Sequence, residues 1–376
     1  MFSKQEYANR LTKVRVEMES RGLDAYVIFD YEFIQGGGSI RYLTNYFLPM
    51  PFMAVLVITP QTTMLTVVPG MQNSERQLAQ RIAVADQIGG DTPGAIMGSD
   101  MAGDIKRALL KANLAGKKVG VDGIFLVQEI FAKMFRDALS DFQVVEWTGI
   151  MDKVRLVKSA EEIKVIHEAA RLADVAMNTF IKAVKVGKRL DHSISEAALA
   201  ADAQGSEKTW SYMATGDDWT WGMTHGPQVY KKGDMVSGEF NSRSEGIYGQ
   251  VCRSFVVGKA SLEQRKACEL INETYREMAS IVKPGITASE IYEAGQKFLK
   301  KAGTEQAFRA GHGMGYSIGE GGSFMAGDKM EMQAGNYIML HPVIPYGKVM
   351  ILSGNSLLVT ETGCEELNKA NFVLEV

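Results

Sequence analysis

The first third of the chain alternates between helical and strand-like patterns of apolar residues. Tyr7, Leu11, Val14 and Met18 recur at helical spacing, which predicts an amphipathic helix over residues 4–21 that Gly22 ends. Strand-length apolar runs lie at 24–30, 54–60, 64–69, 117–123 and 142–147, and helical patterns lie at 74–84, 100–114 and 125–139. This alternation predicts an α/β layer domain over residues 1–152, followed by a linker near 150–159.

The pattern then changes to a long helix with a marked start. Ser159 and Glu162 have the spacing of a capping box, and apolar positions at helical intervals continue as far as Phe180. We therefore expect a second domain over residues 153–376 that opens with this helix.

The second domain contains an internal repeat. A shift of 98 residues places Gly187 on Gly285, and it places Asp191 on Ser289 as the expected N-caps of two second helices. Each copy then consists of a long helix, a break, a second helix and strands. The repeat predicts an α+β domain in which one curved antiparallel sheet is backed by two helix pairs, with a cleft where the halves meet.

Residues 232–258 have the pattern of a β-hairpin between the two helix pairs. Apolar and polar residues alternate, and a polar turn at 243–246 separates the two runs. One half-buried sheet would present Glu239, Gln250 and Cys252 near the glycine-rich segment that carries His312. These residues form a candidate pocket floor.

Composition narrows the class of protein. The 376 residues are 46% hydrophobic and 23% charged with a net charge of −3, which is typical of a globular protein and argues against a nucleic-acid partner. The longest apolar runs have strand length, which argues against a membrane span. Residues 1–6 show no secretory signal, and three cysteines without CxxC spacing argue against a disulfide framework, so a cytoplasmic location is expected.

Several segments together resemble the creatinase/prolidase/methionine-aminopeptidase family. They cover nearly the whole chain and are RLVKSAEEI at 155–163, KGD at 232–234, RSFVVG at 253–258, GHGMG at 311–315 and LVTETG at 358–363. The resemblance implies an N-terminal α/β domain, a C-terminal "pita-bread" domain with a pseudo-two-fold repeat, and a homodimer.

Peptidases of that family hold two divalent metals on two aspartates, one histidine and two glutamates. The matching positions here are, in chain order, Glu239, Gln250, His312, His341 and Gly354. A neutral amide and a glycine stand where the two bridging carboxylates would be, so the resemblance predicts that the dinuclear site is absent. The second catalytic histidine of the peptidases falls on Gly319, although Glu320 beside it is kept.

The metal-free branch of the family, creatinase, is the closest in pattern. Its catalytic histidine matches His225, and Thr209 with Trp210 also resembles creatinase. Its two guanidinium-binding glutamates fall on Cys252 and His341, and the arginine for the carboxylate of creatine falls on or near Met50. These departures argue against creatine as the substrate.

The resulting hypothesis is a metal-independent hydrolase that cleaves a C–N bond in a small nitrogenous substrate. His225 would act as general acid and base, while Glu239, His312, His341 and Glu320 position water and substrate. The expected substrate-binding residues are Trp210, Trp219, Trp221, Tyr248, Gln250, Cys252 and Met50, because dense aromatic residues favour a cationic or flat ligand. His167 and His192 are expected to face solvent.

Five alternatives stay open. The tryptophans can instead close the sheet against the N-terminal domain or a partner, and Cys252 can be a nucleophile if it pairs with His225 or His341. One divalent transition metal on Glu239, His312 and His341 would give a hydrolase or a lyase, since two histidines and one carboxylate are a known ligand set. The chain can also be an Xaa-Pro dipeptidase-related peptidase, or a non-catalytic binder of small molecules or proteins.

Overall fold

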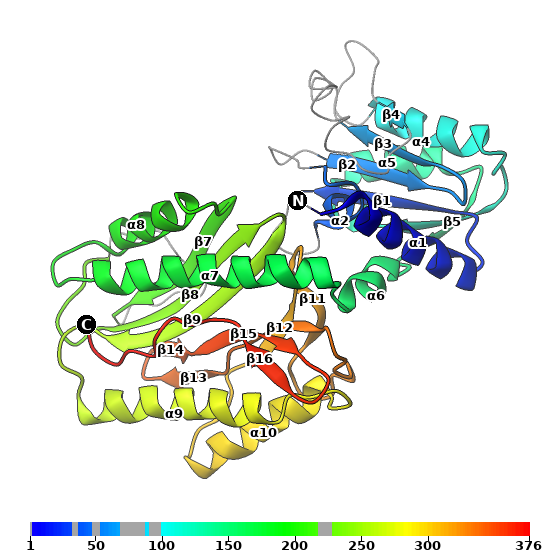
Figure 1. The fold of residues 1–376 in the computed structure, drawn as a ribbon. Helices are drawn as coiled ribbons and strands as arrows, with labels where there is room; N and C mark the ends of the chain where they lie inside the picture. Colours follow the sequence, from blue (N-terminus) through cyan, green and yellow to red (C-terminus); the bar gives the residue numbers. More distant parts are fainter. Residues whose placement is uncertain (1, 32–36, 47–52, 68–86, 90–98, 217–227) are drawn as a thin grey trace. The chain divides into compact units, whose positions relative to one another are not determined.

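The computed structural model describes residues 2–31, 37–46, 53–67, 87–89, 99–216 and 228–376. It divides into two compact units, Met1–Arg155 and Leu156–Val376 (Figure 1). Among the described helices, none has the length and apolar character needed to cross a lipid bilayer.

The first unit is built on a six-stranded mixed sheet with the order β4-β3-β2-β1-β5-β6. Its strands are β1 (Ala25–Tyr31), β2 (Met53–Ile58), β3 (Thr63–Val67), β4 (Gln87–Gly89), β5 (Lys118–Asp122) and β6 (Gln143–Glu146). The pairs β1–β2 and β2–β3 are antiparallel, whereas β3–β4, β1–β5 and β5–β6 are parallel. The predicted strands are therefore present, and the helix predicted at 74–84 lies outside the described residues.

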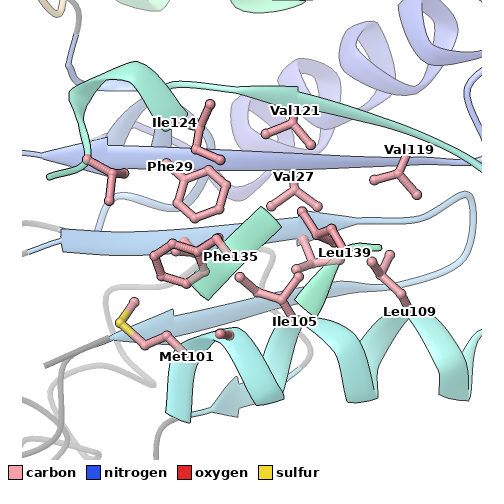
Figure 2. Close-up of a cluster of buried hydrophobic side chains, with 14 of the residues drawn as sticks. Val27, Phe29, Met101, Ile105, Leu109, Val119, Val121, Ile124, Phe135 and Leu139 are labelled. Atoms are coloured by element: carbon pink, nitrogen blue, oxygen red, sulfur yellow. The ribbon is translucent and has the colours of Figure 1, made fainter. Parts of the chain in front are cut away.

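Helices flank this sheet and close its core. They are α1 (Lys4–Ser20), α2 (Ser39–Thr44), α4 (Ser99–Lys111) and α5 (Glu129–Ala138). Figure 2 shows Ile105 and Leu109 of α4 and Phe135 of α5 packed against the apolar side chains of β1 and β5. Phe29 and Phe135 meet edge to face with ring centroids 4.7 Å apart.

The linker predicted at 150–159 is wrong over most of its length. Residues Ile150–Leu156 form helix α6, and Ile150, Met151 and Val154 are buried. Apolar residues at these spacings give the segment a buried helical face, so it packs instead of forming an extended connection.

The second unit contains the predicted repeat of helix pairs. Helices α7 (Ala160–Ala183) and α8 (Leu190–Asp202) form the first pair, and α9 (Leu262–Ser280) and α10 (Ala288–Lys301) form the second. The capping box predicted at Ser159 and Glu162 is present. A similar box starts α9 at Ser261.

The predicted N-caps of the second helices were wrong by two residues. Helix α8 begins after Arg189, which makes no side-chain cap, and α10 begins after Thr287, whose hydroxyl accepts the Glu290 N–H. Arg189 and Thr287 also correspond under the shift of 98 residues, so the error is the same in both copies. Asp and Ser are favoured at N-cap positions, which is why Asp191 and Ser289 were predicted to start these helices.

The strands of the second unit form one eight-stranded antiparallel sheet. Its order is β11-β10-β12-β15-β9-β8-β7, with β16 paired to β15, and β13–β14 is a separate hairpin. The bounds are β7 (Lys208–Thr215), β8 (Met235–Ser244), β9 (Ile247–Val256), β10 (Gly311–Met314), β11 (Ile318–Ser323), β12 (Tyr337–Leu340), β13 (Val343–Tyr346), β14 (Val349–Leu352), β15 (Gly354–Val359) and β16 (Cys364–Glu366). The two repeat halves meet where β9 pairs with β15.

The central hairpin β8–β9 lies where the alternating pattern predicted it. Glu245 and Gly246 form its two-residue turn with φ of 44° and 89°, the left-handed pair that matches the twist of a hairpin. The expectation of a half-buried sheet is wrong, because both faces of β8 and β9 are buried. Part of the second face is covered by β14, where Leu352 exchanges hydrogen bonds with Ser254.

Candidate active site

Strands β7, β8 and β9 carry a polar face that points away from the helices. Phe240 and Val251 belong to the apolar core formed with α7 and α8. Their neighbours along each strand therefore point to the opposite face. Two rows of side chains cross that face in register, namely Tyr212, Glu239 and Cys252 in the first row, and Trp210, Asn241 and Gln250 in the second.

Glu239 lies at the centre of a buried hydrogen-bond network. Its Oε1 accepts from Nδ2 of Asn241 at 3.1 Å, and its Oε2 accepts from Nε2 of Gln250 at 2.7 Å. Cys252 Sγ lies 3.7 Å from the same Oε2. The structure thus brings Glu239, Gln250 and Cys252 together, as the hairpin pattern predicted. Burial raises the pKa of Glu239, and the two amide donors and the charge of Arg309 oppose that rise.

Cys252 is a poor candidate for a nucleophile in this setting. Its thiol is fully buried, and burial together with the neighbouring Glu239 charge raises its pKa well above the usual value. The thiolate is the reactive form of cysteine, and these surroundings disfavour it.

The two histidines predicted for the site come from the other half of the sheet and meet there. His312 lies on β10, and His341 directly follows β12 with its backbone N–H bonded to Ala310. Their rings meet edge to face with centroids 5.2 Å apart. Burial lowers the pKa of His312 well below its usual value and lowers that of His341 to about 3, so both rings are neutral at neutral pH.

Arg309 is a charged residue of the site that sequence reasoning missed. Its positive charge opposes the rise in the pKa of Glu239 and lowers the pKa of both His312 and His341. Its position three residues before His312 was the available signal, but a single arginine beside a turn is not distinctive.

Gly354 lies next to residues of both groups, the rows of side chains on β7–β9 and the two histidines. Gly354 stands opposite Cys252 in the β9–β15 ladder. A Cβ atom on Gly354 would lie 1.9 Å from the carbonyl oxygen of Leu340 and 2.9 Å from the Cα of His341, so no side chain fits there. Among the described residues, no group of three or more His, Cys, Asp or Glu side chains is placed to hold a metal ion. Glu239, His312 and His341 therefore do not converge as a three-ligand set in this structure.

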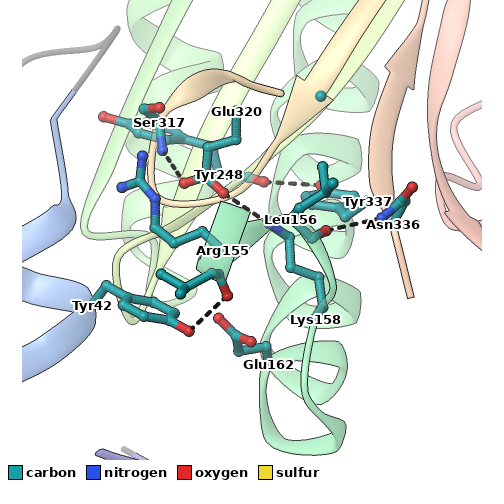
Figure 3. A network of polar contacts seen from close by, with 12 residues as sticks. Tyr42, Arg155, Leu156, Lys158, Glu162, Tyr248, Ser317, Glu320, Asn336 and Tyr337 are labelled. Carbon is teal, nitrogen blue, oxygen red and sulfur yellow. Dashed lines mark hydrogen bonds and ion pairs between the residues drawn. The ribbon is translucent and has the colours of Figure 1, made fainter. Parts of the chain in front are cut away.

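Glu320, predicted to help position water and substrate, is held in a buried ion pair. Its Oε2 lies 2.8 Å from Nζ of Lys158, each side chain is 2% exposed, and its Oε1 accepts the N–H of Ser317 (Figure 3). Cβ atoms on Gly313 and Gly315 would lie 1.6 Å and 2.0 Å from Glu320 atoms. Glu320 thus packs directly against Gly313 and Gly315 and supports the backbone that follows His312.

The remaining predicted residues lie on the sheet, at exposed helix positions, or outside the described residues. Trp210 lies on β7 in edge contact with Tyr212, with ring centroids 5.0 Å apart. Tyr248 is buried on β9, where its backbone bonds Gly315 and the hydroxyl of Tyr337. His167 and His192 are exposed, as expected. Four predicted residues lie outside the described residues, namely Met50, Trp219, Trp221 and His225.

Comparison with known proteins gives consistent matches over both units. The profile of metallopeptidase family M24 matches residues 164–361, and that of the creatinase/prolidase N-terminal domain matches residues 10–157. The Xaa-Pro dipeptidase of Pyrococcus furiosus is 24% identical over 67% of this chain and 73% of its own. The uncharacterized hydrolase/peptidase y4tL of Sinorhizobium fredii is 25% identical over 98% and 96%. The crystal structure of the prolidase from Pyrococcus horikoshii has the same fold, with a TM-score of 0.83 at 19% identity over 97% of this chain and 99% of that one.

Proposed function

The chain belongs to metallopeptidase family M24, and from this premise we propose that it is a hydrolase that cleaves a C–N bond in a small nitrogenous molecule without a pair of metal ions. The observation that carries the proposal is the closed position at Gly354. Peptidases resembling this chain place a bridging glutamate there, and here the backbone of Leu340 leaves no space for a side chain.

Charge supports the same proposal. Of the five positions that hold two metals in the resembling peptidases, only Glu239 retains a carboxylate, and both of its oxygens already accept amide N–H bonds. Gln250 points its amide nitrogen, a donor, at that carboxylate. Two divalent cations require several anionic oxygen ligands to offset their charge, and this donor set does not fit them.

Proton transfer then falls to side chains. The low pKa values of His312 and His341 make both rings weak bases, and they are suited to holding water or substrate through hydrogen bonds. His225, which lies outside the described residues, is the proposed general acid and base. An imidazole with a pKa of about 6.5 takes a proton from water and returns it to the leaving nitrogen.

The relatives suggest the first substrates to test. An Xaa-Pro dipeptidase and a prolidase share the family and the fold, and the bond named for them is an amide C–N bond. Xaa-Pro dipeptides therefore belong in the substrate panel beside amide, ureido and guanidino compounds.

The test is turnover of this panel by metal-analysed protein with and without EDTA. We expect hydrolysis that EDTA does not remove. His225→Ala should lower kcat by about a hundredfold to ten-thousandfold, while His167→Ala, at an exposed position on α7, should leave it unchanged. Stoichiometric metal whose removal abolishes turnover, and whose return restores it, would overturn the metal-free mechanism. No turnover across the panel would favour the non-catalytic binder.

A further inference from the structure

Buried polar atoms without partners gather in the second row of the site. Nε1 of Trp210, Oδ1 of Asn241 and Oε1 of Gln250 have no hydrogen-bond partner among the described residues. Trp210 is the register partner of Asn241, which is the register partner of Gln250, so these three side chains are direct neighbours across β7, β8 and β9. Asn241 is 0% and Gln250 is 1% exposed.

The free atoms of the two amides are fixed by Glu239. Each amide donates its nitrogen to a different oxygen of the Glu239 carboxylate, at 3.1 Å and 2.7 Å. Turning either amide over would set its oxygen against a carboxylate oxygen, which removes a hydrogen bond and adds repulsion. The two amides therefore present oxygens, which are acceptors, to whatever lies beside them.

Buried polar groups in native proteins are nearly always hydrogen-bonded, and an unpaired one costs free energy. Here, among the described residues, one unpaired donor, the indole N–H of Trp210, lies beside two unpaired acceptors, the amide oxygens of Asn241 and Gln250. The complementary ligand offers one acceptor oxygen beside two N–H donors. A primary carboxamide or a ureido group has this arrangement, whereas a quaternary amine or a tertiary amide does not.

We propose that Asn241 and Gln250 form a subsite that binds the –NH2 of a carboxamide or ureido group in the substrate, with the indole N–H of Trp210 bonded to the adjacent oxygen of that group. The inference rests on the proposed function, and it names the substrate class of that same site. Gln250 occupies a position where the resembling peptidases carry a metal ligand, so recognition of an N–H group takes the place of recognition of a metal.

The experiment measures binding by ligand-observed NMR and calorimetry, so it does not require turnover. The probes are N-carbamoylglycine and glycinamide, each compared with the analogue whose –NH2 hydrogens are replaced by methyl groups. Guanidinoacetate serves as a probe with N–H donors and no neighbouring acceptor oxygen at that group. We expect both –NH2 probes to bind at least tenfold more tightly than their methylated analogues and more tightly than guanidinoacetate.

Variants then assign the preference to the subsite. Gln250→Met keeps the length of the side chain and removes the acceptor, and it should reduce the preference for –NH2 about tenfold. Asn241→Asp keeps an acceptor while losing its donor to Glu239, so it should retain the preference and show that a disturbed network is not the cause. Ser237→Ala is the matched control, because Ser237 is buried on the same strand and face and bonds Ser254 at 2.8 Å instead.

Equal binding of the methylated analogues, or an unchanged preference in folded Gln250→Met, would overturn the inference and leave only solvent as the partner of these oxygens. Tighter binding of guanidinoacetate than of N-carbamoylglycine would also overturn it. Turnover of the panel without a preference for –NH2 would remove this inference and leave the proposed function intact. A clear preference for –NH2 in binding, without turnover of any compound, would support this inference and count against the proposed function.

Discussion

Gly354 packs directly against the backbone of Leu340. A Cβ atom at Gly354 would lie 1.9 Å from the Leu340 carbonyl oxygen, far inside the closest approach of real atoms. The sequence has a glycine at this position, where the family resemblance leads one to expect a carboxylate. The packing adds that the space for one is missing as well, so a metal-bridging glutamate cannot be restored here without moving the backbone.

Gly354→Ala should therefore destabilise the fold. We expect the free energy of unfolding to fall by about 1–3 kcal/mol, because the added methyl group forces β12 and β15 apart. Gly363→Ala is the control, since its Cβ would meet no heavy atom closer than 4.0 Å. Urea denaturation of both variants provides the measurement, and equal midpoints would contradict the close packing.

Burial of Glu239 should make stability depend on pH. Its pKa is raised in the folded state, so the folded chain holds a proton that the unfolded chain releases above about pH 4.3. This contribution to stability is present below that pH and is lost as the pH rises through the raised pKa. A glutamine at this position does not ionise, so Glu239→Gln should not lose this stability. Its free energy of unfolding should therefore rise relative to that of the wild type across this pH window, by at most about 1.4 kcal/mol per pH unit.

The matched control for Glu239→Gln is the same change at Glu293, an exposed residue of α10. It alters the net charge equally without touching the site. Parallel stability curves for Glu239→Gln and wild type between pH 4 and 7 would show that burial of this carboxyl is not linked to folding.

Burial of His341 should have the opposite effect on stability, so that the free energy of unfolding falls as the pH falls. Its pKa falls to about 3 in the folded state, compared with about 6.5 when unfolded, so the unfolded chain binds the extra proton. The stability that its neutral ring contributes is present above pH 6.5 and is lost as the pH falls towards 3. His341→Asn should flatten the acid side of the stability curve, whereas His167→Asn at an exposed position should not. Denaturation midpoints measured between pH 4 and 7 would reveal the difference.

Burial is the main cause of the low pKa values of the two site histidines, and the charge of Arg309 should add to it. Its charge lowers the pKa of His312 and of His341, so Arg309→Gln should move both values upwards, while Arg309→Lys retains the charge and should move them much less. The histidine ring protons can be followed by NMR as a function of pH in the folded variants. Unchanged titrations in Arg309→Gln would mean that the guanidinium does not act on the rings.

Replacing one member of the Lys158–Glu320 ion pair should strongly lower the free energy of unfolding. Both side chains are 2% exposed, so Lys158→Met removes the lysine charge beside a buried carboxylate and should lower the free energy of unfolding by about 3–5 kcal/mol. Adding Glu320→Gln should recover much of that loss. The exposed pair of Lys133 and Asp137 provides the comparison, where Lys133→Met should change stability by less than about 1 kcal/mol. Additive effects of Lys158→Met and Glu320→Gln would contradict the coupling.

Local sequence patterns were reliable where a single segment decides the outcome. The hairpin around Glu245 and Gly246 follows from alternation and a turn that needs left-handed residues. The start of α7 follows from the Ser159 capping box. Local preference failed at Arg189, where the helix begins without the capping side chain that Asp191 two residues later would offer.

By itself, the sequence determined the two-domain α+β organisation, the helix repeat and the position of Glu239, Gln250 and Cys252 on one face of β8 and β9, because periodicity and spacing are properties of neighbours along the chain. Only the tertiary structure decided that Glu239 is held by two amides, that Arg309 acts on both histidines, that Glu320 is paired with Lys158, and that Gly354 has no room for a side chain. The ion pair of Lys158 with Glu320 joins segments far apart in the chain, and the contacts of Glu239 with Gln250 and of Gly354 with Leu340 join different strands. The sheet register and the packing of backbone against backbone set them, and neither is encoded in the spacing of residues within one segment.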